Sequence, residues 1–259
     1  TIQNYETALC DVLWYEPEHL DFCALKFGGA FVNSLIIALV STALTLIIGC
    51  MAAYALVRFR FMGRDTASLT TLMVRMVPPA VLLVPVFGLW NNEFCISKKF
   101  WLGELIRDTF GGRGDICLAG THSGIILIYV AMNLPFVIWI LQSFIVQVPR
   151  SLEEAARVDG AGPFQVFFQI VLPLIKPGLA AAAIFTFRIA WNEYLLASAL
   201  SDRDTKTVPI LIVNNMSEFN VEWGVIMATG MLLAIPPIIF TLFASRQIIT
   251  GMTAGAVKG

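Results

Sequence analysis

Residues 29–57 decide the fold, and they read GAFVNSLIIALVSTALTLIIGCMAAYALV. The stretch contains no charged side chain. It exceeds the roughly 20 apolar residues that an α-helix needs to cross a hydrocarbon core about 30 Å thick. A membrane-spanning strand is shorter and alternates apolar with polar residues, so the stretch predicts a membrane-spanning helix.

Four more apolar stretches follow along the 259-residue chain, near residues 67–90, 123–148, 178–200 and 224–245. Prolines inside them do not argue against helices, because neighbouring elements in a membrane satisfy the backbone groups that proline frees. These prolines are Pro78, Pro79, Pro85, Pro135, Pro236 and Pro237. The five stretches predict an all-α polytopic transmembrane helical bundle, organised as a single transmembrane domain over residues 1–259.

The composition excludes several other classes of protein. Apolar residues make up 58% of the chain and charged residues only 14%, whereas a soluble domain has about 25% charged residues. The 17 Lys+Arg and 18 Asp+Glu give a net charge of −1, so neither a disordered chain nor a basic nucleic-acid binder is expected. Residues 1–27 lack the basic start and apolar centre of a signal peptide. The expected surroundings are therefore the lipid bilayer.

The arginines indicate which side of the membrane is cytoplasmic. Arg58, Arg60 and Arg64 lie close together in the short loop between the first two stretches. Basic residues are enriched in short cytoplasmic loops, so we place this loop in the cytoplasm. With five spans, the long loop 149–177 and the C-terminus lie on the same side.

The long loop contains the signals of a short helix. Ser151 followed three positions later by Glu154 predicts a capping box at the start of this helix. Asp159 and Gly160 predict its end after about two turns. A helix this short is unstable alone in water and needs a partner surface, although an ordinary surface loop between two spans is an alternative interpretation.

The spacing of residues in this loop resembles a known motif. Glu154-Ala155-Ala156 is followed after three residues by Gly160 and, after nine more, by Ile170-Val171-Leu172-Pro173. The pattern is similar to the EAA motif of permeases of binding-protein-dependent ABC importers. Further segments look like maltose-type carbohydrate permeases, particularly their G-type subunits: Asn33-Ser34-Leu35, Ala53-Tyr54-Ala55, Arg58-Phe59-Arg60-Phe61, Met76-Val77-Pro78, Trp191-Asn192-Glu193 and the tail 251–259.

The resemblance implies a permease that moves a sugar or a related polar solute, such as a sugar alcohol, a glycoside or glycerol phosphate. Its loop would form a coupling helix in a cleft of a cytoplasmic ATPase. The residues implied in this coupling are Glu154, Ala155, Ala156, Asp159 and Gly160, with Ile170, Leu172 and Pro173 in a supporting helix. Such a chain is a transporter subunit and not an enzyme.

The resemblance also implies partners and a location. The partners would be a second permease subunit, two ABC ATPase subunits and an extracytoplasmic solute-binding protein. ATP and Mg would bind to the ATPase subunits, because this chain has no Gly-x-x-x-x-Gly-Lys-Ser/Thr loop and needs no cofactor of its own. The location would be the bacterial or archaeal cytoplasmic membrane, with the EAA loop and the C-terminus in the cytoplasm.

Two departures from the family pattern stand out. Members usually have six spans, with one before the segment that resembles residues 1–5, so the first of six helices is expected to be absent from this sequence. The external segment 91–122 is also longer than the short turn that is usual there, and the resemblance supplies no role for it.

Charged and polar residues inside spans suggest a function, because each charge costs about 2.5–3.5 kcal/mol at the centre of a membrane helix. Arg188 and Asn192 share one face of the fourth stretch, and Glu193 points elsewhere. With Trp191, they are candidates for the translocation path, and structural pairing between subunits is the alternative. Arg75 is close enough to the cytoplasmic loop for its side chain to snorkel, which we favour over a functional role.

The cysteines and histidines give no metal signature. Cys50 lies inside a span, whereas Cys10, Cys23, Cys95 and Cys117 fall on the proposed outer side, where disulfides can form. Two other classes of function remain open at this stage. One is an ion-coupled secondary carrier, and the other is a non-transporting membrane scaffold.

Overall fold

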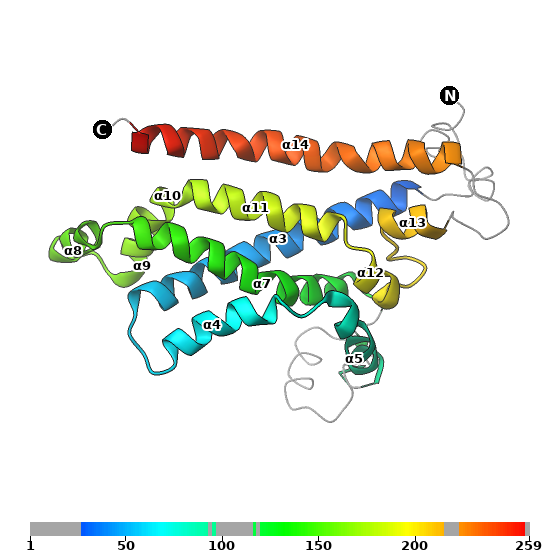
Figure 1. Cartoon of the computed structure of the whole chain (residues 1–259), viewed down its shortest axis with the longest axis horizontal. Coiled ribbons are helices and arrows are strands. Elements are labelled where there is room, and N and C mark those ends of the chain that lie inside the picture. Colours follow the sequence, from blue (N-terminus) through cyan, green and yellow to red (C-terminus); the bar gives the residue numbers. More distant parts are fainter. Residues whose placement is uncertain (1–26, 93–94, 97–115, 118–119, 215–222, 257–259) are drawn as a thin grey trace. The chain divides into compact units, whose positions relative to one another are not determined.

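The computed structural model describes residues 27–92, 95–96, 116–117, 120–214 and 223–256, and almost all of them are helical (Figure 1). The N-terminal segment 1–26, most of the loop 91–122 and the last residues of the tail lie outside the described residues. The chain divides into two compact units. Unit 1 comprises Thr1–Leu39, Val77–Tyr129 and Ala190–Ile235, and unit 2 comprises Val40–Met76, Val130–Ile189 and Pro236–Gly259.

Among the described residues, three helices are long and apolar enough to cross a membrane. They are α3 (Phe27–Arg58), α7 (His122–Gln147) and the Trp223–Ser245 part of α14 (Trp223–Ala256). They correspond to the predicted stretches 29–57, 123–148 and 224–245. The helices continue through Pro135, Pro236 and Pro237, as expected where neighbouring elements satisfy the freed backbone groups.

The second predicted stretch, 67–90, is not one continuous helix. It forms two helices, α4 (Arg64–Val74) and α5 (Pro79–Asn92), with a break between them. Pro78 and Pro79 explain the break, because neither has an amide hydrogen and each disfavours helical backbone in the residue before it. The prediction of one continuous helix is corrected to two separate helices.

The fourth predicted stretch, 178–200, is also interrupted. Helix α11 (Lys176–Trp191) ends inside it, and the short helix α12 (Leu195–Leu200) begins after three intervening residues. The chain before α11 consists of α9 (Pro163–Val166), the π-helix η1 (Phe167–Val171) and α10 (Leu172–Leu174), which are bent by 74° from α11. This bent pair is the other candidate for a broken span, so the described residues provide three to five spans.

Unit 2 has a core built from α3, α7, η1 and α11. The fully buried side chains include Ala53, Val137, Leu141, Ile145 and Val171. Small residues bring these helices close together, since a Cβ atom on Gly49 would lie 2.7 Å from Cγ1 of Val137. Close backbone approach at small residues is the usual way in which membrane helices gain packing energy.

Unit 1 is held together by polar contacts at the start of α3. Asn33 donates hydrogen bonds from Nδ2 to the carbonyls of Asp204 (2.8 Å) and Lys206 (3.1 Å), and its Oδ1 lies 2.8 Å from Nε2 of His122. The hydroxyl of Ser34 accepts the amide hydrogen of Val208 at the first residue of α13 (Val208–Asn214). These contacts fix the segment 201–207 against the beginning of α3.

Two short strands lie in the segment 91–122, to which the family resemblance assigns no role. Strand β1 (Cys95–Ile96) pairs antiparallel with β2 (Ile116–Cys117), and the register places Cys95 opposite Cys117. Directly opposed residues in an antiparallel pair have Cα atoms about 4.5–5.5 Å apart. That spacing lies within the range of about 4.4–6.8 Å at which disulfides form.

We therefore expect Cys95 and Cys117 to be joined in the native protein. Mass spectrometry without reduction should find their two peptides linked. Cys50 is buried in the core of unit 2 and serves as the internal control, because its peptide should remain unlinked. Quantitative alkylation of both thiols in the oxidised native protein would contradict the bridge.

Candidate functional site

Helix α8 (Arg150–Val158) forms the start of the predicted coupling loop. It begins directly after Pro149, and no side chain caps its N-terminus. The predicted capping box of Ser151 and Glu154 is therefore wrong. Proline is tolerated at this position, because it has no amide hydrogen and the first amide hydrogens of a helix have no partner inside the helix.

The predicted end of this helix is confirmed. Asp159 follows the last helical residue, and Gly160 has a left-handed backbone with a φ of 89°. The amide of Gly160 donates to the carbonyl of Arg157 (3.1 Å), and that of Ala161 donates to the carbonyl of Ala156 (2.9 Å). These bonds define a Schellman motif, in which glycine is favoured because its backbone adopts positive φ without strain.

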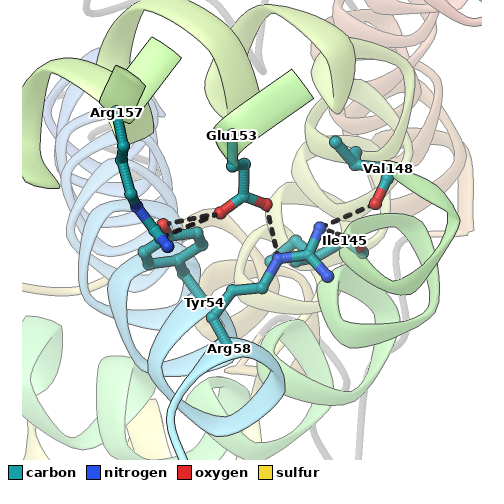
Figure 2. Close-up of polar contacts among 6 residues, drawn as sticks. All are labelled: Tyr54, Arg58, Ile145, Val148, Glu153 and Arg157. Atoms are coloured by element: carbon teal, nitrogen blue, oxygen red, sulfur yellow. Dashed lines mark hydrogen bonds and ion pairs between the residues drawn. The ribbon is translucent and has the colours of Figure 1, made fainter. Parts of the chain in front are cut away.

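The side chain of Glu153 is the polar centre of this region (Figure 2). It is only 2% exposed although it belongs to a short helix on a loop. One carboxylate oxygen lies 2.5 Å from Nε of Arg58. The other accepts a hydrogen bond from the hydroxyl of Tyr54 (3.1 Å) and lies 3.7 Å from Nη2 of Arg157. Glu153 thus connects α8 to the last turns of α3.

Arg58 extends this connection to a third helix. Its Nη2 donates to the backbone carbonyls of Ile145 (3.0 Å) and Val148 (2.8 Å), at the C-terminal end of α7 (Figure 2). The last carbonyls of a helix have no partner inside the helix and carry partial negative charge, so a guanidinium is a favourable donor there. One buried ion pair therefore joins the ends of α3 and α7 to α8.

Aromatic packing supports the ion pair from the side of η1. The ring of Tyr54 lies 5.0 Å from that of Phe167, centroid to centroid. Phe167, Val171 and Ile175 are buried in the core of unit 2. The residues expected to support the loop, Ile170, Leu172 and Pro173, are half-buried or exposed instead. The supporting contacts thus come from their neighbours on the inward side of the same segment.

The outward side of α8 carries the other predicted residues. Glu154, Ala155 and Asp159 are exposed, and Ala156 is half-buried. Three large apolar side chains are also exposed beside them: Leu152 at 44%, Val158 at 87% and Phe164 at 72%. We call these seven residues the α8 face. It is an apolar and acidic surface. The buried side chain of Glu153 anchors α8 on the opposite side of the helix.

Sequence reasoning chose Glu154 and missed Glu153. The signal that could have found it was Arg58, a cation at the end of an apolar span that needs an acidic partner. The i,i+4 spacing of Glu153 and Arg157 was a second signal, because it places both on one side of the helix.

The candidates for the translocation path lie around the break after α11, within unit 1 from residue 190 onwards. Trp191 is buried, and its Nε1 donates to the carbonyl of Leu233 (2.9 Å). Asn192 is exposed, as is Arg188 in unit 2. The carboxylate of Glu193 accepts the amide hydrogens of Leu196 (3.1 Å) and Ala197 (3.0 Å).

Glu193 also contacts a second helix. The hydroxyl of Tyr129 in α7 donates to Oε2 of Glu193 (3.0 Å). The carboxylate therefore caps the N-terminus of α12, where a negative charge is favourable, and ties that end to α7. The described residues contain no group of three His, Cys, Asp or Glu side chains that could hold a metal ion.

Comparison with known proteins agrees with this architecture. The family model of the binding-protein-dependent transport system inner membrane component matches residues 45–252. The trehalose transport permease SugB of Mycobacterium tuberculosis is 36% identical over 236 residues, which cover 90% of this chain and 78% of SugB. The trehalose/maltose transport permease MalG of Thermococcus litoralis is 32% identical over 262 residues, covering 100% of this chain and 82% of MalG.

Solved structures show the same fold. A chain of a bacterial ABC transporter that imports the acidic polysaccharide alginate superposes with a TM-score of 0.63 at 21% identity, covering 94% of this chain and 78% of that chain. A chain of the inward-facing MetNI methionine ABC transporter gives a TM-score of 0.64 at 19% identity, covering 90% of this chain and 98% of that chain.

The fold and the matches define a polytopic membrane permease subunit rather than an enzyme. The chain belongs to the family of inner membrane components of binding-protein-dependent transport systems.

The buried ion pair makes a stability prediction. Arg58→Met leaves the carboxylate of Glu153 buried without its cation, which costs about 3–5 kcal/mol, so the thermal unfolding temperature in detergent should fall. Arg157→Met is the matched control. Its side chain is 53% exposed and lies 3.7 Å from the same carboxylate, so about 1 kcal/mol or less is expected. Equal losses in both variants would contradict the dominant role of Arg58.

The capping role of Glu193 makes a second prediction. Glu193→Gln keeps the shape of the side chain but loses the charge that accepts the amide hydrogens of Leu196 and Ala197. Hydrogen bonds to a charged group contribute about 1.5–3 kcal/mol each, so thermal stability and yield should decrease. Tyr129→Phe removes one donor only and should have a smaller effect. Unchanged stability in Glu193→Gln would rule out a structural role for the carboxylate.

Proposed function

We propose that the chain is the permease subunit of an ABC importer that moves a carbohydrate, or a related polar solute, into the cell. The observation that carries this proposal is the α8 face, which is exposed on a helix anchored from behind by the buried pair of Glu153 and Arg58. The names of the relatives support the solute class. SugB and MalG are described for trehalose and maltose, and DasC of Streptomyces coelicolor for diacetylchitobiose.

In this proposal, the α8 face docks into a cleft of a cytoplasmic ATPase. Val158 at the end of α8 and Phe164 in α9 are exposed, and the loop gains free energy when a partner removes these side chains from water. The ion pair then transmits force. Because Arg58 contacts both Glu153 and the last carbonyls of α7, a displacement of α8 also displaces the ends of α3 and α7.

The proposed assembly contains this chain, a second permease subunit, two ATPase subunits and a solute-binding protein outside the membrane. ATP and Mg bind to the ATPase subunits, and this chain needs no cofactor. The loop with α8 and the C-terminus lie in the cytoplasm. The cluster of Arg58, Arg60 and Arg64 supports this orientation, because basic residues are enriched in short cytoplasmic loops.

Reconstitution tests the function directly. The complete importer in liposomes, supplied with its binding protein and trehalose, should take up the sugar only with ATP inside, and the sugar should stimulate ATP hydrolysis. Uptake by the purified chain alone, driven by an ion gradient, would instead establish a secondary carrier. The carboxylate of Glu193 is engaged as a helix cap by the amide hydrogens of Leu196 and Ala197, which argues against its use for ion coupling in such a carrier.

Substitution of Gly160 tests docking. Gly160→Asp should abolish solute-stimulated ATP hydrolysis while membrane insertion stays normal, because a larger charged residue then occupies the turn that closes the α8 face. Gly63→Asp is the matched control: Gly63 has the same φ of 89°, and a Cβ at either glycine meets nothing within 4 Å.

Both glycine variants carry the same left-handed backbone penalty, about 1–2 kcal/mol. Only Gly160 lies on the docking loop, so Gly63→Asp should keep solute-stimulated hydrolysis. Full stimulation in Gly160→Asp, or equal losses in both variants, would contradict a docking role for Gly160.

A further inference from the structure

Arg75 occupies an unusual position in unit 2. It follows the last residue of α4, at the break before α5, and its side chain is exposed. Its Cζ atom lies 4.3 Å from the ring centroid of Phe136 in α7. A guanidinium over an aromatic face is attracted by the ring's negative potential. The side chain is thus held on this ring, whereas the sequence favoured snorkelling toward the cytoplasm.

Arg188 is a second exposed arginine, and it lies about as far from a basic residue at the start of its helix as Arg75 does. Arg75 comes eleven residues after Arg64, and Arg188 comes twelve residues after Lys176. At about 1.5 Å per residue, both lie about 16–18 Å from these basic residues, which is half of a hydrocarbon core about 30 Å thick. A charge at this depth is costly against lipid, so both guanidinium groups require water, protein or a ligand.

Aromatic rings connect the two arginines. Phe185 in α11 packs edge-on against Phe136, with centroids 6.0 Å apart and an interplanar angle of 90°. Phe185 is itself 47% exposed. Arg188 lies one turn further along α11 and shares the face of Phe185, because residues three apart are neighbours on a helix surface. Arg75, Phe136, Phe185 and Arg188 together form what we call the arginine–aromatic face.

The chemistry of this face suits one class of solute. A sugar ring presents C–H groups, which are attracted to the negative face of an aromatic ring. Its hydroxyl groups can accept hydrogen bonds from guanidinium donors, and a carboxylate, sulfonate or phosphate can be bound by the two prongs of a guanidinium. Two arginines beside two aromatic rings therefore match a glycoside with an acidic group better than a neutral one.

We propose that the arginine–aromatic face lines the translocation path and binds the transported solute, with preference for a glycoside that carries an acidic group. The proposal rests on the proposed importer function and adds a site within this chain. It makes Arg75 and the exposed Phe185 solute-contacting residues, with the ring of Phe136 holding Arg75, and places Arg188 with them.

Accessibility of the face to water is the first test, and it needs no knowledge of the solute. In the complete importer in liposomes, with native cysteines replaced by alanine, Phe185→Cys should react with a membrane-impermeant thiol reagent. Ile47→Cys on α3 is the control, since Ile47 is 58% exposed on a stretch without charged side chains. Phe185→Cys should react at least tenfold faster, and equally slow reactions in all nucleotide states would overturn the proposal.

Protection by solute is the second test. A disaccharide with a glucuronic acid unit should slow the labelling of Phe185→Cys at a concentration at least fivefold below that of its neutral glucose counterpart. Arg75→Met should abolish this difference, and Arg60→Met, an exposed arginine outside the face, should preserve it. Equal protection by both sugars, or protection that is unchanged in Arg75→Met, would overturn the preference for an acidic group.

A third measurement covers the case in which the cysteine-free protein does not assemble. Arg75→Met in the otherwise native importer should lower uptake of the acidic disaccharide at least tenfold, whereas Arg60→Met should keep uptake within twofold of the unmodified importer. Unchanged uptake in this variant would overturn the site. Failure of the proposed function has a different signature, namely an unmodified importer in which ATP drives no uptake, whatever the accessibility of Phe185→Cys.

Discussion

The structure around the coupling loop depends on one constraint: a buried carboxylate must be compensated. Glu153 is 2% exposed, and an ionised group withdrawn from water persists only with an opposite charge and hydrogen bonds. Arg58 can provide the charge because α3 ends at this residue. Its Nη2 donates to two backbone carbonyls at the end of α7. Three helices are therefore fixed to one another by the requirements of a single side chain.

The breaks in the helices follow from local chemistry of two kinds. Between α4 and α5, Pro78 and Pro79 remove backbone donors, so the chain has to turn. Between α11 and α12 there is no proline or glycine, and the carboxylate of Glu193 takes over instead. It accepts the first amide hydrogens of α12, which the preceding helix would otherwise satisfy. Both breaks lie in stretches that are apolar enough to read as continuous spans.

The sequence predicts the long helices and the end of α8, but not the partner of α8 or the break at Glu193. Apolar length predicted α3, α7 and α14, because the cost of unpaired backbone groups in lipid leaves few alternatives to a helix. The end of α8 was predictable because Gly160 has a backbone conformation that favours glycine. The inward side of α8 was not predictable, since Glu153 and Glu154 are adjacent carboxylates. Only the position of Arg58 in space decides which of the two is buried. The break at Glu193 also required knowledge of where Tyr129 lies.

The same ion pair offers a mechanical route from the loop to the arginine–aromatic face. Arg58 contacts the carbonyl of Ile145, and Phe136 lies nine residues earlier on the same helix. That separation is about 14 Å along α7, and α7 is continuous between them. A helix transmits an axial displacement over such a length because its backbone hydrogen bonds and its packed side chains resist compression. Movement of α8 would therefore reach the ring under Arg75 through one rigid element, without a chain of side-chain rearrangements.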